Sequence, residues 1–268
     1  MSNIIWLSPS QIDTFQHCQR KWGWRYLNKI ILPPNYAAEI GLRGHGILEK
    51  YLTTAHLNPL ESDLHHLCSM GAHLYPAPCT PGLQIEHHFG CMIGGYRFHG
   101  YKDVQLLQRP LSHGRCVGCS DTTRCDECLP RVWDHKFTSN LRWAKSDEVL
   151  RTDTQAVIYL FDAMLKADYP KARGTWVYYQ RKGARKIQRS EVTLRVEDLS
   201  VPLKEILKAA AKIHYIRKNY TSALQLPPNV LACSDFGGCG YSSLCNLTPK
   251  DRFTSLIKSE KARLVWQQ

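Results

Sequence analysis

The stretch Arg131–Phe137 constrains the fold of this chain more than any other. It reads Arg-Val-Trp-Asp-His-Lys-Phe, an apolar-flanked segment that is typical of a strand. Because successive side chains of a strand point to opposite faces, we expect Asp134 and Lys136 on one face and His135 on the other. A carboxylate beside an ammonium group can hold a divalent cation and offset the charge of a phosphate. An ordinary ion pair uses the same two residues, so the accompanying motifs have to decide between the two interpretations.

Net charge restricts the class of partner. The 268 residues carry a formal charge of +12 at pH 7, which favours a polyanion, with nucleic acid ahead of an acidic protein or a membrane surface. At this length we expect a single domain over residues 1–268. The sequence has no apolar run long enough to span a bilayer and no secretory pattern at its start. We therefore expect a soluble cytoplasmic protein, in a reducing compartment, with no membrane partner.

The cysteine pattern predicts metal sites. Eleven cysteines in a reducing compartment favour ligation over disulfides. Four follow the spacing Cys-x2-Cys-x5-Cys-x2-Cys and predict a structural zinc site in a small insertion over residues 112–130, with free thiols as the alternative: Cys116, Cys119, Cys125 and Cys128. Three more fall within the 13 residues 233–245, one short of closed coordination, and the isolated Cys18 is their natural fourth: Cys233, Cys239 and Cys245.

Further candidate site residues lie on predicted helices and on a predicted hairpin. A glycine-rich helix entry at 39–52 carries His45. The alternative is that His45 is simply packed or solvated, as a lone histidine usually is. Extended segments at 83–86 and 96–104, separated by Gly94-Gly95, predict a hairpin whose outgoing strand holds Asp103, a second carboxylate for the same cation. A helix from 154 to 167 places Gln155 and Tyr159 on one face, where a tyrosine tied to a core partner is the alternative.

Sequence patterns outside these motifs predict further helices and strands. Ser8 and Pro9 predict a helix start, residues 174–180 and 186–196 predict a second hairpin, and residues 202–220 predict a long helix.

Basic residues gather in two segments. Residues 19–27 interleave cationic and aromatic side chains, and residues 171–189 contain seven basic residues and no acidic one. Both are candidate phosphate-contacting surfaces. A solvated helix face and a charged sheet edge that prevents strand pairing are the respective alternatives. The candidate DNA-binding residues are Arg20, Lys21, Arg43, Arg181, Lys182 and Arg185.

Taken together, these motifs resemble the RecB-like branch of the PD-(D/E)XK nuclease superfamily, closest to phage-type exonucleases and the CRISPR-associated RecB-like exonuclease. The resemblance runs in order along nearly the whole chain. It rests on these stretches: Ser8-Pro9-Ser10, Cys18-Gln19-Arg20-Lys21, the glycine-flanked His45, Gly100-Tyr101-Lys102-Asp103, Asp134-His135-Lys136, Gln155-x3-Tyr159 and the terminal cysteines. The insertion between Cys116 and Cys128 is not part of the pattern.

The resemblance implies an α/β fold, with a mixed central β-sheet flanked by helices in a restriction-endonuclease-like core. It implies that His45, Asp103 and Asp134 ligate Mg²⁺ or Mn²⁺, with the carbonyl of His135 able to contribute, and that Lys136 positions the attacking water. Gln155 and Tyr159 would line the site. A [4Fe–4S] cluster on Cys18, Cys233, Cys239 and Cys245 would join residues 1–27 to residues 228–248.

The resulting expectation is a metal-dependent DNA exonuclease acting on single-stranded or frayed ends, in phage or CRISPR-type DNA processing or recombination. The resemblance also admits a homo-oligomer and a recombination or CRISPR-adaptation partner protein, in a prokaryotic cell or phage-infected host. Two alternatives remain, a DNA-end-binding accessory protein of the same fold without catalysis and an iron-sulfur redox sensor. If the iron-sulfur cluster were the functional centre, Asp134→Ala and Lys136→Ala would leave the activity of the protein unchanged. Cleavage of DNA by neither the unchanged protein nor Lys136→Ala would favour the accessory protein.

Overall fold

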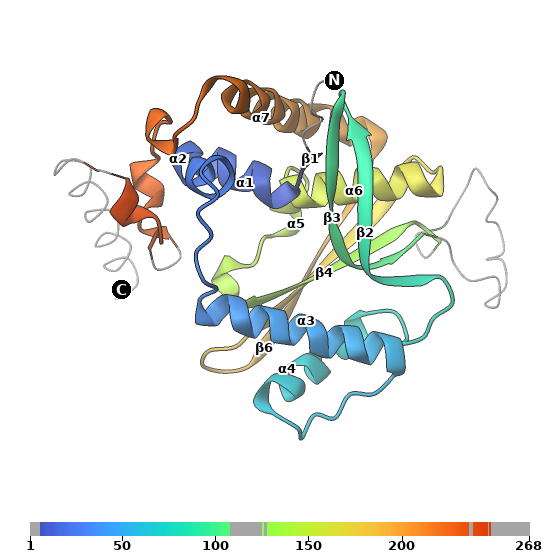
Figure 1. The fold of residues 1–268 in the computed structure, drawn as a ribbon. Helices are drawn as coiled ribbons and strands as arrows, with labels where there is room; N and C mark the ends of the chain where they lie inside the picture. Colours follow the sequence, from blue (N-terminus) through green and yellow to red (C-terminus); the bar gives the residue numbers. More distant parts are fainter. Residues whose placement is uncertain (1–5, 108–124, 126–127, 236–237, 246, 248–268) are drawn as a thin grey trace. The chain divides into compact units, whose positions relative to one another are not determined.

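The computed structural model describes residues 6–107, 125, 128–235, 238–245 and 247 (Figure 1). The chain divides into two compact units. The first comprises residues 1–33 and 206–268, and the second comprises residues 34–205. No helix among the described residues is long and apolar enough to cross a membrane.

The first unit brings together the two ends of the chain. Its helix α1 begins as predicted, with the Ser8 hydroxyl accepting a hydrogen bond from Gln11 N and Pro9 in the first turn. A small core packs around Trp24, Ala223 and Tyr241. The unit's elements are β1 (Trp6–Leu7), α1 (Pro9–His17), α2 (Gln19–Trp22), a π-helical turn (Gly23–Leu27), most of α7 (Ser200–Asn219) and three short 3₁₀ turns (Ala223–Gln225, Val230–Ala232, Ser242–Leu244).

The second unit is built on a mixed β-sheet, as expected. Its five strands pair in the order β2-β3-β4-β5-β6; β4 and β5 run parallel, and every other neighbouring pair is antiparallel. Strand β5 is buried along most of its length and carries the apolar run Trp176–Tyr179, whereas burial alternates along much of β6. The strands are β2 (Leu83–Ile93), β3 (Tyr96–Leu106), β4 (Arg131–Thr138), β5 (Lys171–Gln180) and β6 (Lys186–Arg195).

Helices cover both faces of this sheet (Figure 1). Strand β4 shows the two sides, because Asp134 contacts α6 while its neighbour His135 faces α3. The core on the α3 side includes Leu48, Cys68 and Tyr179. The helices of this unit are α3 (Tyr36–Thr54), α4 (Asp63–Gly71), α5 (Asp147–Leu150) and α6 (Thr154–Ala167).

The β2–β3 hairpin is longer than predicted. Its turn is Gly94-Gly95, where both glycines have positive φ, 54° and 84°, as a tight two-residue turn requires. Strand β4 pairs with β3 only from Val104 to Leu106, so most of the hairpin projects beyond β4 (Figure 1). The pairing of β2 with β3 omits Glu86, whose φ is +47°.

A glycine sets the distance between α3 and the sheet. A Cβ placed on Gly44 would lie 2.2 Å from Cζ of Phe137 on β4, too close for any side chain. The helix can therefore approach β4 closely only because residue 44 is glycine. This contact brings the next residue, His45, against His135, with ring centroids 4.3 Å apart.

The predicted cysteine-rich insertion falls largely outside the described residues. Cys116 and Cys119 are among those not described, whereas Cys125 and Cys128 are described.

Candidate active site and metal centre

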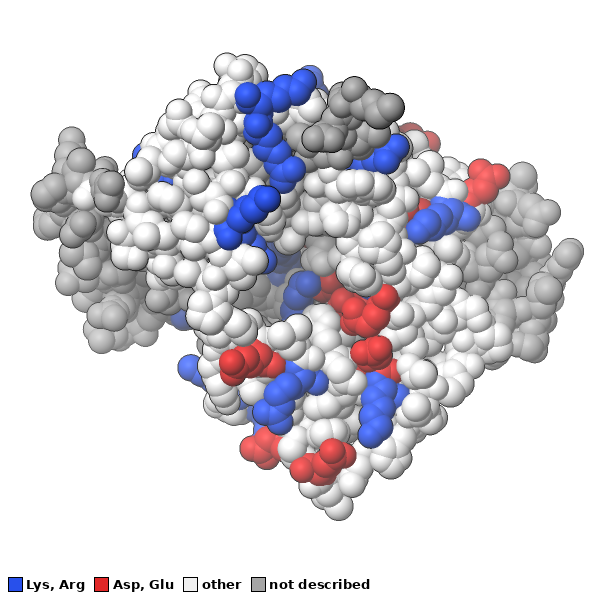
Figure 2. All heavy atoms as spheres, viewed as in Figure 1, with Lys and Arg blue, Asp and Glu red and all other residues white. Residues whose placement is uncertain are grey.

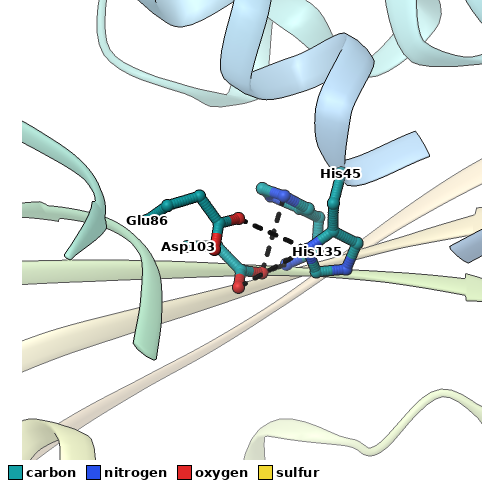
Figure 3. Close-up of side chains that lie close together, drawn as sticks. All are labelled: His45, Glu86, Asp103 and His135. Atoms are coloured by element: carbon teal, nitrogen blue, oxygen red, sulfur yellow. Dashed lines mark hydrogen bonds and ion pairs between the residues drawn. The ribbon is translucent and has the colours of Figure 1, made fainter. Parts of the chain in front are cut away.

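Four side chains from four elements converge at one point of the second unit (Figure 3). His45 comes from α3, Glu86 from β2, Asp103 from β3 and His135 from β4, and one donor atom of each lies within 4.8 Å of all the others. Within the described part of the chain this is the only such group. Two imidazoles and two carboxylates are a donor set that suits a divalent cation.

The separations leave room for a shared ligand. His45 Nδ1 lies 3.6 Å from Glu86 Oε1 and 3.6 Å from Asp103 Oδ1, and His135 Nε2 lies 3.6 Å from Asp103 Oδ2. Ligands about 2.1 Å from one ion at right angles are about 3 Å apart. The donors are therefore close to the spacing that a common cation needs. The backbone N–H of His135 donates to Asp103 Oδ2 at 2.8 Å and holds that carboxylate in place.

His135 provides the test of whether this group fits a cation. Its side chain is only 1% exposed, and neither ring nitrogen has a hydrogen-bond partner within the described structure. Burial, together with the nearby His45, lowers the pKa of His135 to about 3. The ring is therefore neutral at pH 7, with a lone pair available, and a buried polar group without a partner is costly unless something binds to it. The residues present fit a cation.

The other donors show how the cluster balances charge. Burial raises the pKa of Asp103 despite the opposing effects of His45 and Lys136. Burial alone would lower the pKa of His45, but the Glu86 and Asp103 carboxylates outweigh it and the pKa is raised. The His45 ring lowers the pKa of Glu86. The His45 ring has to be unprotonated to ligate a cation, so proton release accompanies binding.

Asp134 and Lys136 form a second group beside the donor cluster. Lys136 Nζ lies 2.9 Å from Asp134 Oδ1 and 2.7 Å from Oδ2. The two side chains therefore share a face of β4, as the strand pattern predicted. Burial would lower the pKa of Lys136, but the charges of Asp134 and Asp103 raise it above its usual value, so the ammonium stays protonated. Burial raises the pKa of Asp134, which is fully enclosed.

Helix α6 supplies the amide and phenol that complete this group. Gln155 Nε2 donates to Asp134 Oδ1 at 2.8 Å and to the Tyr159 hydroxyl at 3.0 Å. The Tyr159 hydroxyl in turn donates to the backbone carbonyl of Tyr101 on β3. The i, i+4 pair expected on this helix therefore links Asp134 on β4 to β3.

The structure thus places the predicted site residues in two adjoining groups. His45 and Asp103 join the donor cluster, and Asp134, Lys136, Gln155 and Tyr159 form the hydrogen-bonded group next to it. His135 joins the cluster through its ring, whereas its backbone carbonyl was the expected ligand. The carboxylate of Asp134 was expected among the metal ligands, yet its oxygens contact Lys136 and Gln155.

Sequence reasoning missed Glu86. It lay at the end of a predicted extended segment, and no motif marks it. The structural signal is its φ of +47°, a left-handed conformation that costs a non-glycine residue about 1 kcal/mol or more. That conformation interrupts the ladder opposite Asp103, where the Glu86 carboxylate meets His45. Only the paired register of β2 and β3 could have revealed that Glu86 belongs to the donor cluster.

A cleft connects the donor cluster to the surface. It encloses about 720 Å³ and is lined by α3 and the β2–β3 hairpin. His45 and Glu86 reach it from the cluster, and Leu42 and Tyr101 are exposed around it. Figure 2 shows carboxylate side chains next to Lys and Arg side chains near the centre of the face drawn. The described residues that line the cleft include His45, Glu49 and Glu86 and no lysine or arginine, so the cleft itself suits a cation.

The candidate DNA-binding residues occupy different environments. The Arg20 guanidinium donates to the carbonyls of Leu226 at 2.8 Å and Cys245 at 2.7 Å, so its donors hold the first unit together. Arg43 is exposed on α3, and Lys21 is half-buried on α2. In the β5–β6 turn, Arg181, Lys182 and Arg185 line a pocket of about 260 Å³; Arg181 stacks over Tyr36, and Arg185 pairs with Asp63 at 2.7 Å.

Four cysteines of the first unit lie near one another. Burial first, and then the neighbouring thiols of Cys239, Cys18 and Cys245, raise the pKa of Cys233 to about 11. Cys18 Sγ accepts backbone hydrogen bonds from Asn229 at 3.3 Å and Lys21 at 3.5 Å. The four cysteines that were grouped from the sequence therefore lie in the same part of the first unit.

One comparison with known proteins identifies the family. A sequence model of the PD-(D/E)XK nuclease superfamily matches residues 6–246. The crystal structure of SSO0001 is similar to this chain at 14% sequence identity and a TM-score of 0.46, covering 92% of this chain and 90% of that one. The search of curated proteins found no match.

Proposed function

Because the chain belongs to the PD-(D/E)XK nuclease superfamily, we propose that it is a metal-dependent deoxyribonuclease that hydrolyses phosphodiester bonds with water as the nucleophile. The family implies a nucleic-acid substrate and suggests a nuclease that needs a metal ion. The observation that carries the proposal for this chain is the pairing of a four-donor cluster with a lysine that stays protonated beside a buried aspartate.

His45, Glu86, Asp103 and His135 would hold the cation. A divalent ion bound there supplies Lewis-acid stabilisation of negative charge on the phosphate and eases deprotonation of water. The family resemblance adds Asp134 and the His135 carbonyl to this set. We propose that Asp134 contributes its charge from the adjoining group, where it also holds Lys136.

Lys136 would orient the attacking water and offset charge on the phosphate. Its Nζ is fixed by both Asp134 oxygens, so it loses little rotational freedom on substrate binding. Gln155 fixes Asp134 from α6, and Tyr159 ties that helix to β3. These contacts pre-organise the ammonium before substrate arrives.

The donor chemistry favours Mn²⁺ over Mg²⁺. Mg²⁺ prefers oxygen ligands and near-ideal octahedral geometry, whereas the cluster offers two imidazole nitrogens and two carboxylates. We propose that both ions support cleavage and that Mn²⁺ supports more at equal concentration.

The substrate we propose is DNA with single-stranded or frayed ends, digested from the end, in phage or CRISPR-type processing or recombination. The support is the family resemblance, the net charge of +12 and the basic side chains of the β5–β6 turn.

We propose a [4Fe–4S] cluster on Cys18, Cys233, Cys239 and Cys245. Four thiols within mutual electrostatic influence, one of them accepting two backbone N–H groups, fit thiolate ligation of such a cluster. A zinc site is proposed for the insertion. Cys125 Sγ and Cys128 Sγ lie 3.5 Å apart, near the separation of about 3.8 Å for thiolates on one zinc ion.

The test is cleavage of labelled single- and double-stranded DNA with Mn²⁺ or Mg²⁺. We expect Lys136→Ala to lower the cleavage rate by about 10²- to 10⁴-fold, while DNA affinity measured with Ca²⁺ changes little. Lys212→Ala, which removes an exposed lysine on α7, is the control and should cleave as the unchanged protein does.

Each other outcome selects a different function. Equal cleavage by Lys136→Ala and the unchanged protein would overturn the proposed site. DNA binding without cleavage by any form would favour the end-binding accessory. A coloured, redox-active protein that neither binds nor cleaves DNA would favour the iron-sulfur sensor.

A further inference from the structure

Aromatic side chains form a row on one face of the β2–β3 hairpin. Tyr101 is 59% exposed, and its ring meets the ring of His88 edge-on with centroids 5.1 Å apart. The His88 ring also meets His99, with centroids 5.9 Å apart. We name these three residues, Tyr101, His88 and His99, the hairpin row. Neither the motifs nor the family match assigns a role to them.

Strand register connects the hairpin row to the cation donors. His88 pairs with Tyr101 across the hairpin, so their side chains leave the same face. His99, Tyr101 and Asp103 alternate along β3, which also puts them on one face, about 6.8 Å apart per step. The row therefore begins one step from Asp103 and runs away from the donor cluster.

The cleft supports this continuity. Tyr101 lines the same 720 Å³ cleft as His45 and Glu86. A strand whose scissile phosphate lies at the donor cluster thus has the Tyr101 ring beside its next bases. The face is open at this point, because the Tyr101 side chain is exposed.

Contacts with α6 also fix the backbone of this part of the hairpin. The Tyr159 hydroxyl donates to the backbone carbonyl of Tyr101, and Tyr159 is bound to Gln155, which holds Asp134. The next residue, Lys102, is fully buried and paired with Asp162 of α6. The backbone that presents the Tyr101 ring is therefore anchored to the same helix that orders the catalytic group.

We propose that the hairpin row is a base-stacking platform for the single-stranded part of the DNA substrate adjoining the scissile phosphate. Exposed rings on a rigid strand face stack bases of any sequence, because every base has a π-face. This inference rests on the proposed nuclease function and deepens it, since it makes a single-stranded end the form of substrate that the site holds.

The test combines side-chain removal with base removal. Binding of a labelled single-stranded oligonucleotide is measured in Ca²⁺, with single abasic positions moved along it. We expect Tyr101→Ala to weaken binding by about 5- to 100-fold and Tyr101→Phe to leave it unchanged, because the ring and not the hydroxyl stacks. His99→Ala should give a smaller loss. Tyr215→Ala is the control, since Tyr215 is equally exposed, at 58%, on α7.

The abasic scan shows whether the ring and a base contact each other. For the unchanged protein we expect a loss of affinity confined to one or two positions, and in Tyr101→Ala the same abasic positions should cost nothing further. The proposal would be overturned if the abasic positions lowered affinity equally in both proteins. It would also be overturned if no abasic position lowered the affinity of the unchanged protein, and that result holds even if Tyr101→Ala were to fold poorly. If the protein cleaves DNA but gives either result, the proposed nuclease function stands and the stacking platform is rejected. If the protein neither binds nor cleaves DNA, both the nuclease function and the stacking platform are rejected.

Discussion

At the scale of single residues, Glu86 combines a left-handed backbone conformation with a position in the donor cluster. Its left-handed φ costs free energy within a strand. In this conformation its carboxylate contacts His45. We predict that Glu86→Gln lowers Mn²⁺ affinity by about 10- to 100-fold, the range that follows loss of even an outer-sphere partner. Isothermal titration calorimetry measures this.

The matched control for that change is Glu49→Gln. Glu49 lines the same cleft from α3 but does not belong to the donor cluster. Its replacement should leave Mn²⁺ affinity unchanged. Equal affinities for the two variants would remove Glu86 from the ligand set.

Titration of the donors gives a second prediction at this scale. The pKa values of His45 and Asp103 are raised, so the cation-free site takes up protons as the pH falls, and those protons must leave when a cation binds. Lower pH therefore weakens cation binding. We predict that saturating Mn²⁺ raises the melting temperature more at pH 8 than at pH 5.5. Equal increases at both pH values would contradict this assignment of donors.

At the scale of secondary-structure elements, the approach of α3 to β4 positions the histidines. Gly44→Ala forces a Cβ into the Phe137 ring, 2.2 Å from Cζ. We predict a loss of unfolding free energy of about 1–3 kcal/mol, as overpacking of a core produces, together with weaker Mn²⁺ binding because His45 moves. Urea denaturation and calorimetry report the two effects.

The same helix offers the control. A Cβ on Gly41 would meet nothing within 4 Å, so Gly41→Ala should stabilise the protein by about 0.5–1 kcal/mol through helix propensity alone. If Gly44→Ala behaved like Gly41→Ala, the close approach of α3 would not be what positions His45.

The elements themselves were largely predictable from the sequence. Periodicity and turn residues predicted the helix after Ser8, the hairpin at Gly94-Gly95, strand β4 and helix α6, and the structure confirms them. The bounds of β2 and α3 were predicted too short. Cross-strand pairing and a buried helix face extend these elements, and neither is a property of the local sequence.

At the scale of the whole molecule, the cysteines tie together distant parts of the chain. The first unit contains both the residues near Cys18 and those near Cys239. We predict that Cys239→Ser, purified without oxygen, loses broad visible absorbance and melts at a lower temperature, because a cluster closing more than 200 residues of chain removes loop entropy from the unfolded state.

Cys79→Ser is the control for the cluster. Cys79 lies in the second unit, is exposed, and donates from its thiol to a backbone carbonyl. Its replacement should leave the visible spectrum unchanged. A colourless protein that contains only zinc would contradict the iron-sulfur assignment and leave the nuclease site in the second unit untouched.

The sequence by itself determined the face shared by Asp134 and Lys136, through the alternation of side chains along a strand. The order of its motifs pointed to the family, and the family resemblance implied the mixed sheet with flanking helices. Only the tertiary structure decided that Glu86 meets His45 and that Asp134 turns toward Gln155. It alone decided, too, that the hairpin row continues from Asp103. The physical reason is that donor distances and shared faces depend on strand register and on how closely helices pack, and both arise from contacts between residues far apart in the chain.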